Sequence, residues 1–392
     1  MSKEFIVVGG GIGGLATGLA IAQVGHKVTI LEQAPEIGEV GAGIQLAPNA
    51  TNILKQLGVF DDIAKTAVFP KRLVLKDART GEELSALDLG EKFRERYGAP
   101  YIVLHRADLQ YGLLRACEAS PNVTIKVDSH VEKVEDLGDA ARVTLSNGVT
   151  YTADAVIGAD GLHSKTRKFF IEDSPVPSEY VAYRGTIPME EIVERAQIQM
   201  DDVIMWIAPY LHLVQYPVRR GELYNLVIVF KSYNYKPDSD DWGTPEEMDR
   251  RFADSCEPVK HMVSFISRQR RWPMYDRNPM ENWTSKRVAL LGDAAHPMLQ
   301  YMAQGGCQAL EDVACLKHCL QTYGDDLSKA FEAYKEERVP RATSVQRNVR
   351  LWGEFLHAED PMAIFLRRRI LTRRSADDYS DVDWLYSKKY SI

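Results

Sequence analysis

The chain has 392 residues, of which 45% are hydrophobic and 26% are charged, and its net charge is −7. This composition is typical of a globular protein of about two domains, and the negative charge argues against nucleic acid or an anionic membrane as the main partner. The sequence has no apolar run of the roughly 18 residues that a transmembrane segment needs, no signal-peptide pattern and no metal-type pairing of its five cysteines. We therefore expect a cytoplasmic protein without a metal site.

A glycine-rich motif follows the first predicted strand. Residues 5–8 are apolar and β-prone, and residues 15–24 predict a helix. Between them lies G-x-G-x-x-G, whose glycines permit a tight turn, close approach of a pyrophosphate, and packing of the helix on the sheet. A second strand, at 28–31, ends in an acid that can accept hydrogen bonds from a ribose and that disfavours a 2′-phosphate. We therefore predict that FAD or NAD is bound here by Gly9, Gly11, Ile12, Gly14 and Glu32.

Two further stretches are candidates for the cofactor site. Residues 36–46 are too glycine-rich for a regular element, and they predict either a loop beside the ligand, with Ala42 and Gln45 as contacts, or a plain connection. Residues 101–104 predict a strand. Arg106, at the start of the helix that follows, can reach a cofactor phosphate or carbonyl, although a lone arginine is more often a surface charge.

The middle of the chain predicts β structure. Three runs, at 123–127, 131–135 and 141–145, predict a meander that ends in a hairpin turn. A buried strand at 155–157 then leads into Gly-Ala-Asp-Gly, where Asp160 repeats the arrangement of strand, sharp turn and acid. From about residue 183 to 271, further β-prone runs predict an antiparallel sheet that forms a second domain inserted into the first.

One of these runs carries two side chains suited to chemistry. Because side chains alternate along a strand, His212 and Tyr216 are expected to point to the same face. A single histidine on a strand more often has only a structural role, so the pair needs support from other motifs.

The last motif begins at residue 292. A buried strand at 287–291 breaks at Gly-Asp, and a loop leads to a helix that covers 309–320. Asp293 can accept hydrogen bonds from a hydroxylated chain, and Gly305 and Gly306 let backbone N–H groups approach a ligand, although Gly-Asp after a strand is also common in plain turns. The tail is predicted to be mostly helical. Its basic run at 367–374 is a solvated helix face, a dimer contact or a site for anionic lipid.

In order and separation, the three motifs resemble those of the single-component flavoprotein aromatic hydroxylases: the first glycines with Glu32, 158–161 with Ser164 and Arg167, and 292–297. The resemblance implies a para-hydroxybenzoate hydroxylase-like α/β fold. A Rossmann-like FAD-binding domain would cover 1–180 and 276–340, an inserted antiparallel substrate domain 181–275, and a helical segment 341–392. The first motif would bind the ADP half of FAD, Asp293 the ribityl chain, and Asp160 both FAD and the nicotinamide nucleotide. NADH, or else NADPH, is the expected electron donor, and a homodimer is the expected assembly.

Within this family the chain most resembles the 3-hydroxybenzoate 6-hydroxylases, which convert 3-hydroxybenzoate to gentisate. This resemblance rests on 100–101, 182–186, His212 with 215–217, 272–277 and 299–301. Position 300 is the most informative, because Gln300 matches that group, whereas salicylate and 6-hydroxynicotinate hydroxylases usually carry proline there. Decarboxylating hydroxylases of these two types are the alternative. Hypotheses from other functional classes are an oxidase, a dehydratase-like flavoprotein and a flavin-binding redox sensor without turnover.

The expected reaction suggests a role for each pocket residue. Adding an oxygen atom to an aromatic carbon requires an electron-rich ring, and a phenol becomes electron-rich when its proton is removed. A neutral histidine, with an ordinary pKa of about 6.5, suits this task, so we predict that His212 accepts the phenolic proton. Tyr216 would line the pocket or relay the proton, Gln300 would orient the ring or the reacting oxygen, and Tyr101 would complete the pocket. The carbon para to the phenol would be hydroxylated.

Overall fold

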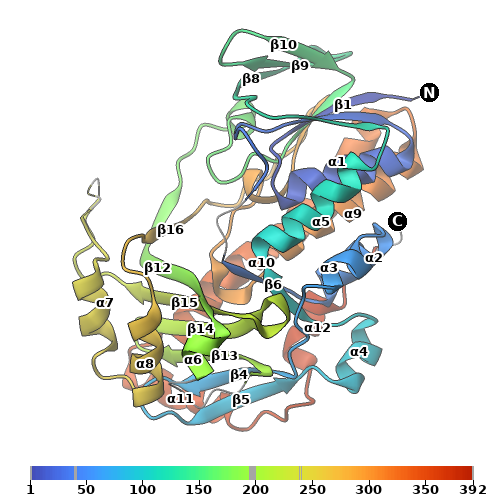
Figure 1. The fold of residues 1–392 in the computed structure, drawn as a ribbon. Coiled ribbons are helices and arrows are strands. Elements are labelled where there is room, and N and C mark those ends of the chain that lie inside the picture. The colour runs from blue at the N-terminus through green and yellow to red at the C-terminus, as the bar shows by residue number, and fades with distance from the viewer. Residues whose placement is uncertain (1, 39–41, 194–199, 238, 240, 391–392) are drawn as a thin grey trace.

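A parallel five-stranded sheet forms the centre of the upper half of the molecule (Figure 1). The computed structural model describes residues 2–38, 42–193, 200–237, 239 and 241–390. The strand order is β17-β11-β1-β2-β7, and each neighbouring pair is parallel. The strands are β1 (Glu4–Val8), β2 (Lys27–Leu31), β7 (Val123–Lys126), β11 (Ala155–Gly158) and β17 (Val288–Leu290).

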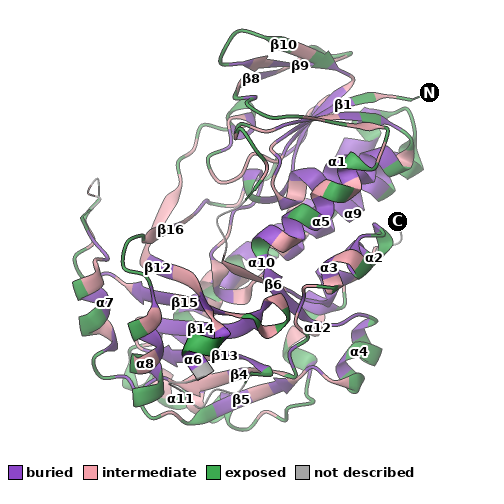
Figure 2. Ribbon diagram, in the orientation of Figure 1, coloured by how far each residue is buried: buried purple, intermediate pink, exposed green. Residues whose placement is uncertain are grey.

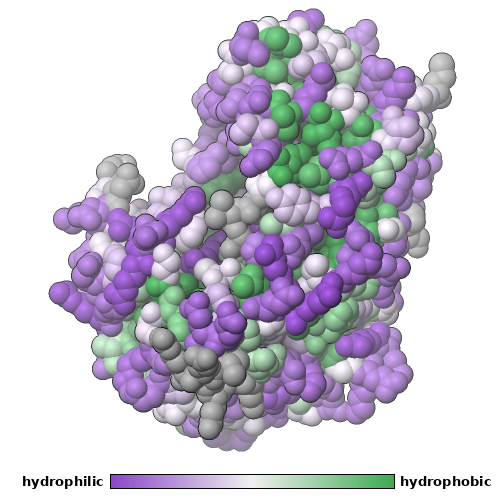
Figure 3. Space-filling view, in the orientation of Figure 1, coloured by the Kyte–Doolittle hydropathy of each residue, from purple (hydrophilic) through white to green (hydrophobic). Residues whose placement is uncertain are grey.

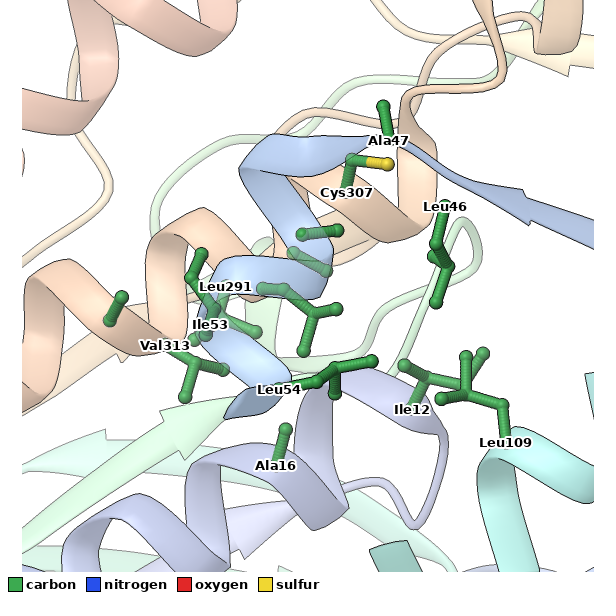
Figure 4. Close-up of a cluster of buried hydrophobic side chains, with 14 of the residues drawn as sticks. Ile12, Ala16, Leu46, Ala47, Ile53, Leu54, Leu109, Leu291, Cys307 and Val313 are labelled. Carbon is green, nitrogen blue, oxygen red and sulfur yellow. The ribbon is translucent and has the colours of Figure 1, made fainter. Parts of the chain in front are cut away.

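Helices pack against this sheet and against one another around a common apolar core. The helices of this half are α1 (Ile12–Val24), α2 (Pro48–Gln56), α3 (Phe60–Ala64), α5 (Arg106–Glu118), α9 (Gly305–Tyr323) and α10 (Leu327–Leu356). The helix α4 (Glu91–Tyr97) lies at the lower right of Figure 1, and its Phe93 and Tyr97 belong to the same core. Side chains from α1, α2 and α9 meet in this core together with Leu291, which follows β17 (Figure 4). The core therefore joins the N-terminus of α1 to the loop that follows β17.

A seven-stranded sheet forms the other half, in the order β16-β12-β15-β14-β13-β4-β5. Adjacent strands in this sheet are antiparallel except for the parallel pair β13 and β4. The strands are β4 (Arg72–Asp77), β5 (Glu83–Asp88), β12 (Val176–Pro188), β13 (Asp202–Ala208), β14 (Leu211–Val218), β15 (Leu223–Lys231) and β16 (Trp272–Asp276). One face packs against α6 (Met189–Val193), α7 (Pro245–Phe252) and α8 (Glu257–Phe265) in a second core. The opposite face belongs to the large core that it shares with the parallel half.

The remaining elements connect or flank these two halves. An antiparallel three-stranded sheet lies at the top of Figure 1, and a two-stranded sheet lies between the halves. Short 3-10 turns lie in the loops, and two helices follow α10. These elements are β3 (Gly43–Leu46), β6 (Ile102–His105), β8 (Val131–Asp136), β9 (Ala141–Leu145), β10 (Thr150–Ala153), η1 (Thr166–Phe169), η2 (Arg219–Gly221), η3 (Gly292–Ala294), η4 (Gln300–Met302), α11 (Pro361–Leu371) and α12 (Ser380–Tyr386).

The distribution of buried residues follows the two cores. In Figure 2, β13, β14, β15 and α9 are mainly buried, whereas the outer helices carry exposed faces. The face drawn in Figure 3 is mainly hydrophilic, with apolar groups in smaller areas between. Among the described helices, none has the length and apolar character needed to cross a membrane.

The predicted α/β fold with an antiparallel sheet and a helical C-terminus is confirmed. Two details differ from the sequence-based interpretation. The run at 123–127 predicts the start of a meander, but β7 pairs in parallel with β2, and only β8, β9 and β10 form the antiparallel unit. In addition, β4 and β5, which come from the first 180 residues, extend the seven-stranded sheet. Both pairings join segments far apart in the chain, so local patterns do not encode them.

Candidate active site

The glycine motif after β1 leaves an open position at the N-terminus of α1. Gly9 has a φ of +107°, and a Cβ there would lie 2.4 Å from the carbonyl oxygen of Ala159. A Cβ on Gly14 would lie 1.9 Å from the carbonyl oxygen of Gly9, so both positions require glycine for packing. At Gly11, by contrast, a Cβ would have no described heavy atom within 4 Å beyond the adjoining chain. The space at Gly11, beside free helix N–H groups, fits a phosphate.

Glu32 lies beside this loop, where the sequence places it. Its carboxylate accepts hydrogen bonds from the N–H groups of Gly10 (2.6 Å) and Ala34 (2.8 Å). The buried amide of Gln110 donates to the carbonyl oxygen of Gly10 at 3.0 Å and holds the loop from the other side. Ile12 begins α1 and is buried in the core. Glu32 is thus in position to accept hydrogen bonds from an adenosine ribose, and that role stays a prediction.

The Gly-Asp loop after β17 places Asp293 near the start of α9. Gly292 has a φ of +60°, which favours glycine. The side chain of Asp293 is exposed to solvent. The surrounding protein nevertheless reduces the solvation of its carboxyl and raises its pKa, and this effect outweighs the opposing influence of His296 and Arg106. A Cβ on Gly305 would lie 3.9 Å from Oδ1 of Asp293, so the acid borders the N-terminus of α9. An exposed acceptor in such a cradle fits a hydroxyl-bearing chain.

Buried charged side chains stabilise the Gly-Asp loop. Asp312 accepts hydrogen bonds from the N–H of Gly292 (2.8 Å) and from Nε2 of His296 (2.6 Å), and it pairs with Arg338 at 2.6 Å. Burial alone would raise the pKa of the Asp312 carboxyl, but His296 and Arg338 outweigh burial and lower it. Arg167 donates to the carbonyl oxygens of Ala294 and Ala295 at 3.0 and 2.7 Å. The motif at 158–161, with its Arg167, therefore stabilises the motif at 292–297.

Asp160 is largely engaged by its own turn. It accepts hydrogen bonds from the hydroxyls of Ser164 (2.6 Å) and Thr166 (3.2 Å), and from the N–H groups of Lys165 (2.8 Å) and Thr166 (3.0 Å). The structure thus gives Asp160 a clear structural role, and a direct cofactor contact stays a prediction.

Arg106 and Ala42 lie next to each other in the cofactor region. The N–H of Arg106 donates to the carbonyl oxygen of Ala42 at 3.0 Å. Arg106 is exposed at the first position of α5, and its charge acts on both Asp293 and Arg184. Residues 39–41 of the glycine-rich loop lie outside the described residues. The α9 glycines border the same region, because a Cβ on Gly306 would lie 3.1 Å from Ile44.

One face of the seven-stranded sheet gathers the pocket candidates. His212, Val214 and Tyr216 of β14 share this face, as the alternation predicts, because Val214 and Tyr216 both belong to the core shared with the parallel half. Strand registers place Val229, Val227 and Asn225 of β15 opposite them. The next register places Ala182, Arg184 and Thr186 of β12 on the same face. The centre of this surface is therefore apolar, with polar groups around it.

Gln45 joins the two tyrosines of this region. The hydroxyl of Tyr101 donates to Oε1 of Gln45 at 2.7 Å, and Gln45 also interacts with the hydroxyl of Tyr216. The N–H of Gly43 donates to Oδ1 of Asn225 at 2.6 Å. β3 therefore docks onto the sheet face, and Gln45, predicted as a cofactor contact, lies between the two tyrosines. Burial raises the pKa of Tyr101 and Tyr216, so both keep their protons at neutral pH.

His212 is buried and neutral. Burial, followed by the proximity of His357, lowers its pKa well below the ordinary value. Its Nδ1 lies 2.7 Å from Nε2 of His357, and Tyr301 packs edge-on against it with ring centroids 5.6 Å apart. Tyr301 fits there because Gly353 of α10 has no side chain, since a Cβ would lie 2.4 Å from the ring.

Arg184 is a site residue that the sequence analysis did not single out. Its Nη2 donates to Oε1 of Gln300 at 2.5 Å, whereas its Nε is buried without a partner. No ion pair of Arg184 with a described carboxylate is present. Burial, together with Arg106, lowers the pKa of the guanidinium. The sequence could have indicated Arg184 because it is a charged residue at a core-facing position of a predicted strand, and a cation in such a position needs an anionic partner.

Comparison with known proteins identifies the family of this chain. The family profile described as "FAD binding domain" matches residues 3–349. The 3-hydroxybenzoate 6-hydroxylase of Klebsiella oxytoca is 36% identical over 388 residues, which cover 98% of this chain and 96% of the relative. The 3-amino-4-hydroxybenzoate 2-monooxygenase of Streptomyces cremeus is 34% identical, with 97% and 94% covered.

A solved structure shows the same fold. Klebsiella pneumoniae HpxO complexed with FAD and uric acid superposes with a TM-score of 0.85 at 24% identity, and the match covers 98% of this chain and 95% of HpxO. The fold and the glycine and Gly-Asp loops thus define a FAD-binding flavoprotein. The chain belongs to the FAD-dependent aromatic hydroxylase family, and it is a flavoprotein aromatic monooxygenase.

Proposed function

We propose that this monooxygenase hydroxylates 3-hydroxybenzoate at the carbon para to its phenol and gives gentisate, with NADH or, alternatively, NADPH as electron donor. The observation that carries the proposal is the pairing, on one sheet face, of a neutral buried histidine with a half-buried arginine that has no described carboxylate partner. The relative from Klebsiella oxytoca, with its full-length match, supports the same substrate.

The spacing of His212 and Arg184 suits an aromatic acid whose hydroxyl and carboxylate are on non-adjacent ring carbons. His212 is on β14 and Arg184 on β12, with β15 between them. Since neighbouring strands lie about 4.8 Å apart, the two backbones are about 10 Å apart, which leaves room for an aromatic ring between the side chains. Val227 and Val214 lie in this interval and offer an apolar surface for the ring. In salicylate the two groups are on adjacent carbons, so a single molecule would not reach both residues as well.

Each polar group then has a separate task. Arg184 binds the substrate carboxylate, and the ion pair offsets the cost of its buried charge. His212 accepts the hydrogen bond of the phenol through Nε2, because Nδ1 is occupied by His357. Gln300, held by Arg184, lies on the loop that follows the Gly-Asp motif and orients the ring toward the flavin side. Tyr101 and Tyr216, joined by Gln45, form the wall of the pocket.

The residues around the glycine and Gly-Asp loops would hold FAD, which supplies the transfer of electrons from NAD(P)H to O₂ and thereby a reactive oxygen. The chain contributes an environment that excludes water, since His212 and Tyr216 are both at most 2% exposed. Removal of the phenolic proton makes the ortho and para carbons electron-rich, and the para carbon of 3-hydroxybenzoate is its carbon 6.

Products from a panel of aromatic acids test this proposal. The purified FAD-loaded enzyme is incubated with NADH or NADPH and with 3-hydroxybenzoate, 4-hydroxybenzoate, salicylate, 6-hydroxynicotinate or 3-amino-4-hydroxybenzoate. We expect gentisate from 3-hydroxybenzoate, with nucleotide consumption matched by product. Catechol from salicylate, with no gentisate, would instead establish the alternative decarboxylating hydroxylase. Nucleotide oxidation that gives only hydrogen peroxide would contradict both.

We also propose a cytoplasmic homodimer. The support is an apolar surface on α11, where Met362, Phe365 and Ile370 are 63%, 53% and 60% exposed beside the basic residues of the same helix. Light scattering of the purified protein tests this point, and a monomer at micromolar concentration would contradict it.

A further inference from the structure

His212 and His357 form a hydrogen-bonded pair of imidazoles inside the protein. His212 is 1% exposed and His357 is 5% exposed. Their ring planes differ by 11° and their centroids lie 5.0 Å apart, while Nδ1 of His212 lies 2.7 Å from Nε2 of His357. These values describe two rings side by side in nearly one plane rather than stacked face to face, because the centroid distance equals the N···N distance plus the two ring radii. The N–H bond therefore points along the line that joins the two nitrogens.

The hydrogen bond couples the tautomers of the two rings. Two neutral imidazoles can share one hydrogen bond only if one nitrogen donates and the other accepts. When Nδ1 of His212 donates, its Nε2 carries the lone pair and can accept the proton of a phenol. When Nε2 of His357 donates instead, Nε2 of His212 carries a proton and cannot act as a base. His357 therefore controls which state His212 presents to the substrate.

The surroundings keep both rings uncharged. Burial, followed by the charge of Arg367 on α11, lowers the pKa of His357 to about 3. Arg367 is itself buried and donates to the carbonyl oxygens of Phe355 and Leu356. Two tyrosines also contact the pair: Tyr180 of β12 stacks on His357 with ring centroids 4.7 Å apart, and Tyr301 of η4 is edge-on to both rings. No carboxylate among the described residues pairs with either histidine, so a lasting positive charge on His212 would be unfavourable.

We propose that His357 is the second member of a two-imidazole proton relay, which sets the tautomer of His212 and carries the substrate's phenolic proton out of the buried site. The proposal rests on a phenolic substrate but not on which phenolic acid it is. The phenol O–H bond breaks as Nε2–H of His212 forms, and Nδ1–H of His212 breaks as Nε2–H of His357 forms. The proton on Nδ1 of His357 then passes to water. Both rings end neutral in the other tautomer, and return of a proton by the reverse path resets them.

The position of His357 gives this relay an outlet. His357 caps the C-terminus of α10, and Glu359 and Asp360, two and three residues later, are exposed. In an imidazole, Nδ1 and Nε2 point in different directions, so Nδ1 of His357 points away from His212. Among the described residues, Nδ1 has no hydrogen-bond partner that would block the transfer. Relay through neutral rings resolves the conflict between the depressed pKa of His212 and its task of removing a proton.

Proton release on ligand binding tests the relay without turnover. The FAD-loaded enzyme is mixed, without nucleotide and without oxygen, with the phenolic acid that the product panel identifies as substrate. A pH indicator in weak buffer reports protons released, and the ultraviolet spectrum reports phenol or phenolate. The variants are His357→Gln, which can keep one hydrogen bond to His212 but cannot relay, and His357→Phe, which keeps only the ring volume. His26→Gln, at a buried histidine distant in sequence and outside the site, serves as the control.

We expect the wild-type protein and the His26→Gln control to release protons in proportion to bound ligand. His357→Gln should bind the acid and FAD normally but release protons more slowly and lose about 10²-fold or more in kcat, with KM little changed. Added imidazole should restore part of the rate in the His357→Phe variant if that protein keeps its FAD. Wild-type proton release in His357→Gln would overturn the relay, as would ligand binding to the wild-type protein as an undissociated phenol. Failure of 3-hydroxybenzoate alone in the panel would affect only the proposed substrate.

Discussion

Replacement of Gly11 by alanine should weaken FAD binding without changing the stability of the fold. The added methyl group would meet no described atom within 4 Å beyond the adjoining chain, and Gly11 has an ordinary φ of −73°, so the apoprotein should keep its stability. An alanine in a compatible conformation can even stabilise by about 0.4–1 kcal/mol. If the pyrophosphate of FAD occupies this space, the methyl group displaces it from the helix N–H groups. Loss of one or two charge-assisted hydrogen bonds, each about 1.5–3 kcal/mol, corresponds to a loss in FAD affinity of roughly 10- to 10⁴-fold.

The matched variant is Gly14→Ala. Here the methyl group would lie 1.9 Å from a backbone oxygen, so the turn itself must move, and we expect a destabilisation of about 3 kcal/mol or more. Thermal unfolding of both apoproteins and flavin fluorescence titrations provide the two readouts. Unchanged FAD affinity in Gly11→Ala, together with unchanged stability, would refute the placement of the pyrophosphate at this loop.

Four further outcomes follow from the site. Arg184→Gln should raise the KM for the aromatic acid by about 10²-fold, while FAD stays bound, because the ion pair with the substrate carboxylate is lost; an unchanged KM would remove Arg184 from the carboxylate site. Gln300→Ala should uncouple nucleotide oxidation from product formation, and normal coupling with the same product would exclude it. Gly353→Ala should displace Tyr301 from His212 and lower kcat, which a wild-type rate would contradict. Arg338→Met should cost about 3–5 kcal/mol because Asp312 loses its buried ion pair with the guanidinium, and the variant should unfold more easily at pH 8 than at pH 5.5.

The sign of that last pH effect follows from the pKa values. In the native protein, burial is the largest single influence on the pKa of Asp312 and would raise it, but His296 and Arg338 together outweigh burial and lower the pKa. The pKa of the Glu311 carboxyl is likewise lowered, against burial, by Arg338 and Arg341. These acids therefore stabilise the fold above their ordinary pKa values, and their contribution is lost as the pH falls through the lowered values. Without Arg338, burial should raise the pKa of the Asp312 carboxyl, whereas Glu311 keeps its ion pair with Arg341, so we expect the variant to lose stability as the pH rises and Asp312 ionises. Melting curves at both pH values measure this reversal.

The cofactor half was predictable because its information is local. Gly9, Gly11 and Gly14 stand between a strand and a helix within a short segment, and the Gly-Asp loop stands between another strand and helix. The shared face of His212 and Tyr216 also follows from strand periodicity alone. Each of these features depends on backbone geometry that a few neighbouring residues determine.

The partners of these residues were not predictable in the same way. His357 lies 145 residues from His212 and has no motif around it. Arg184 meets Gln300 only because β12 and the loop after β17 come together in the fold, 116 residues apart. The pairing of β4 with β13 is likewise determined by tertiary packing. The half-buried position of Arg184 and the burial of His357, rather than their sequence context, make them candidates for function.

The position of the new hydroxyl group decides whether the proposed reaction is right. Purified FAD-loaded enzyme is supplied with NADH, 3-hydroxybenzoate and isotopically labelled O₂, and the product is identified by NMR and mass spectrometry. We predict gentisate with one labelled oxygen atom at the carbon para to the original phenol, in amounts that match the NADH consumed. A labelled hydroxyl at an ortho carbon, or no labelled aromatic product at all, would contradict the arrangement of His212 and Arg184 around the substrate.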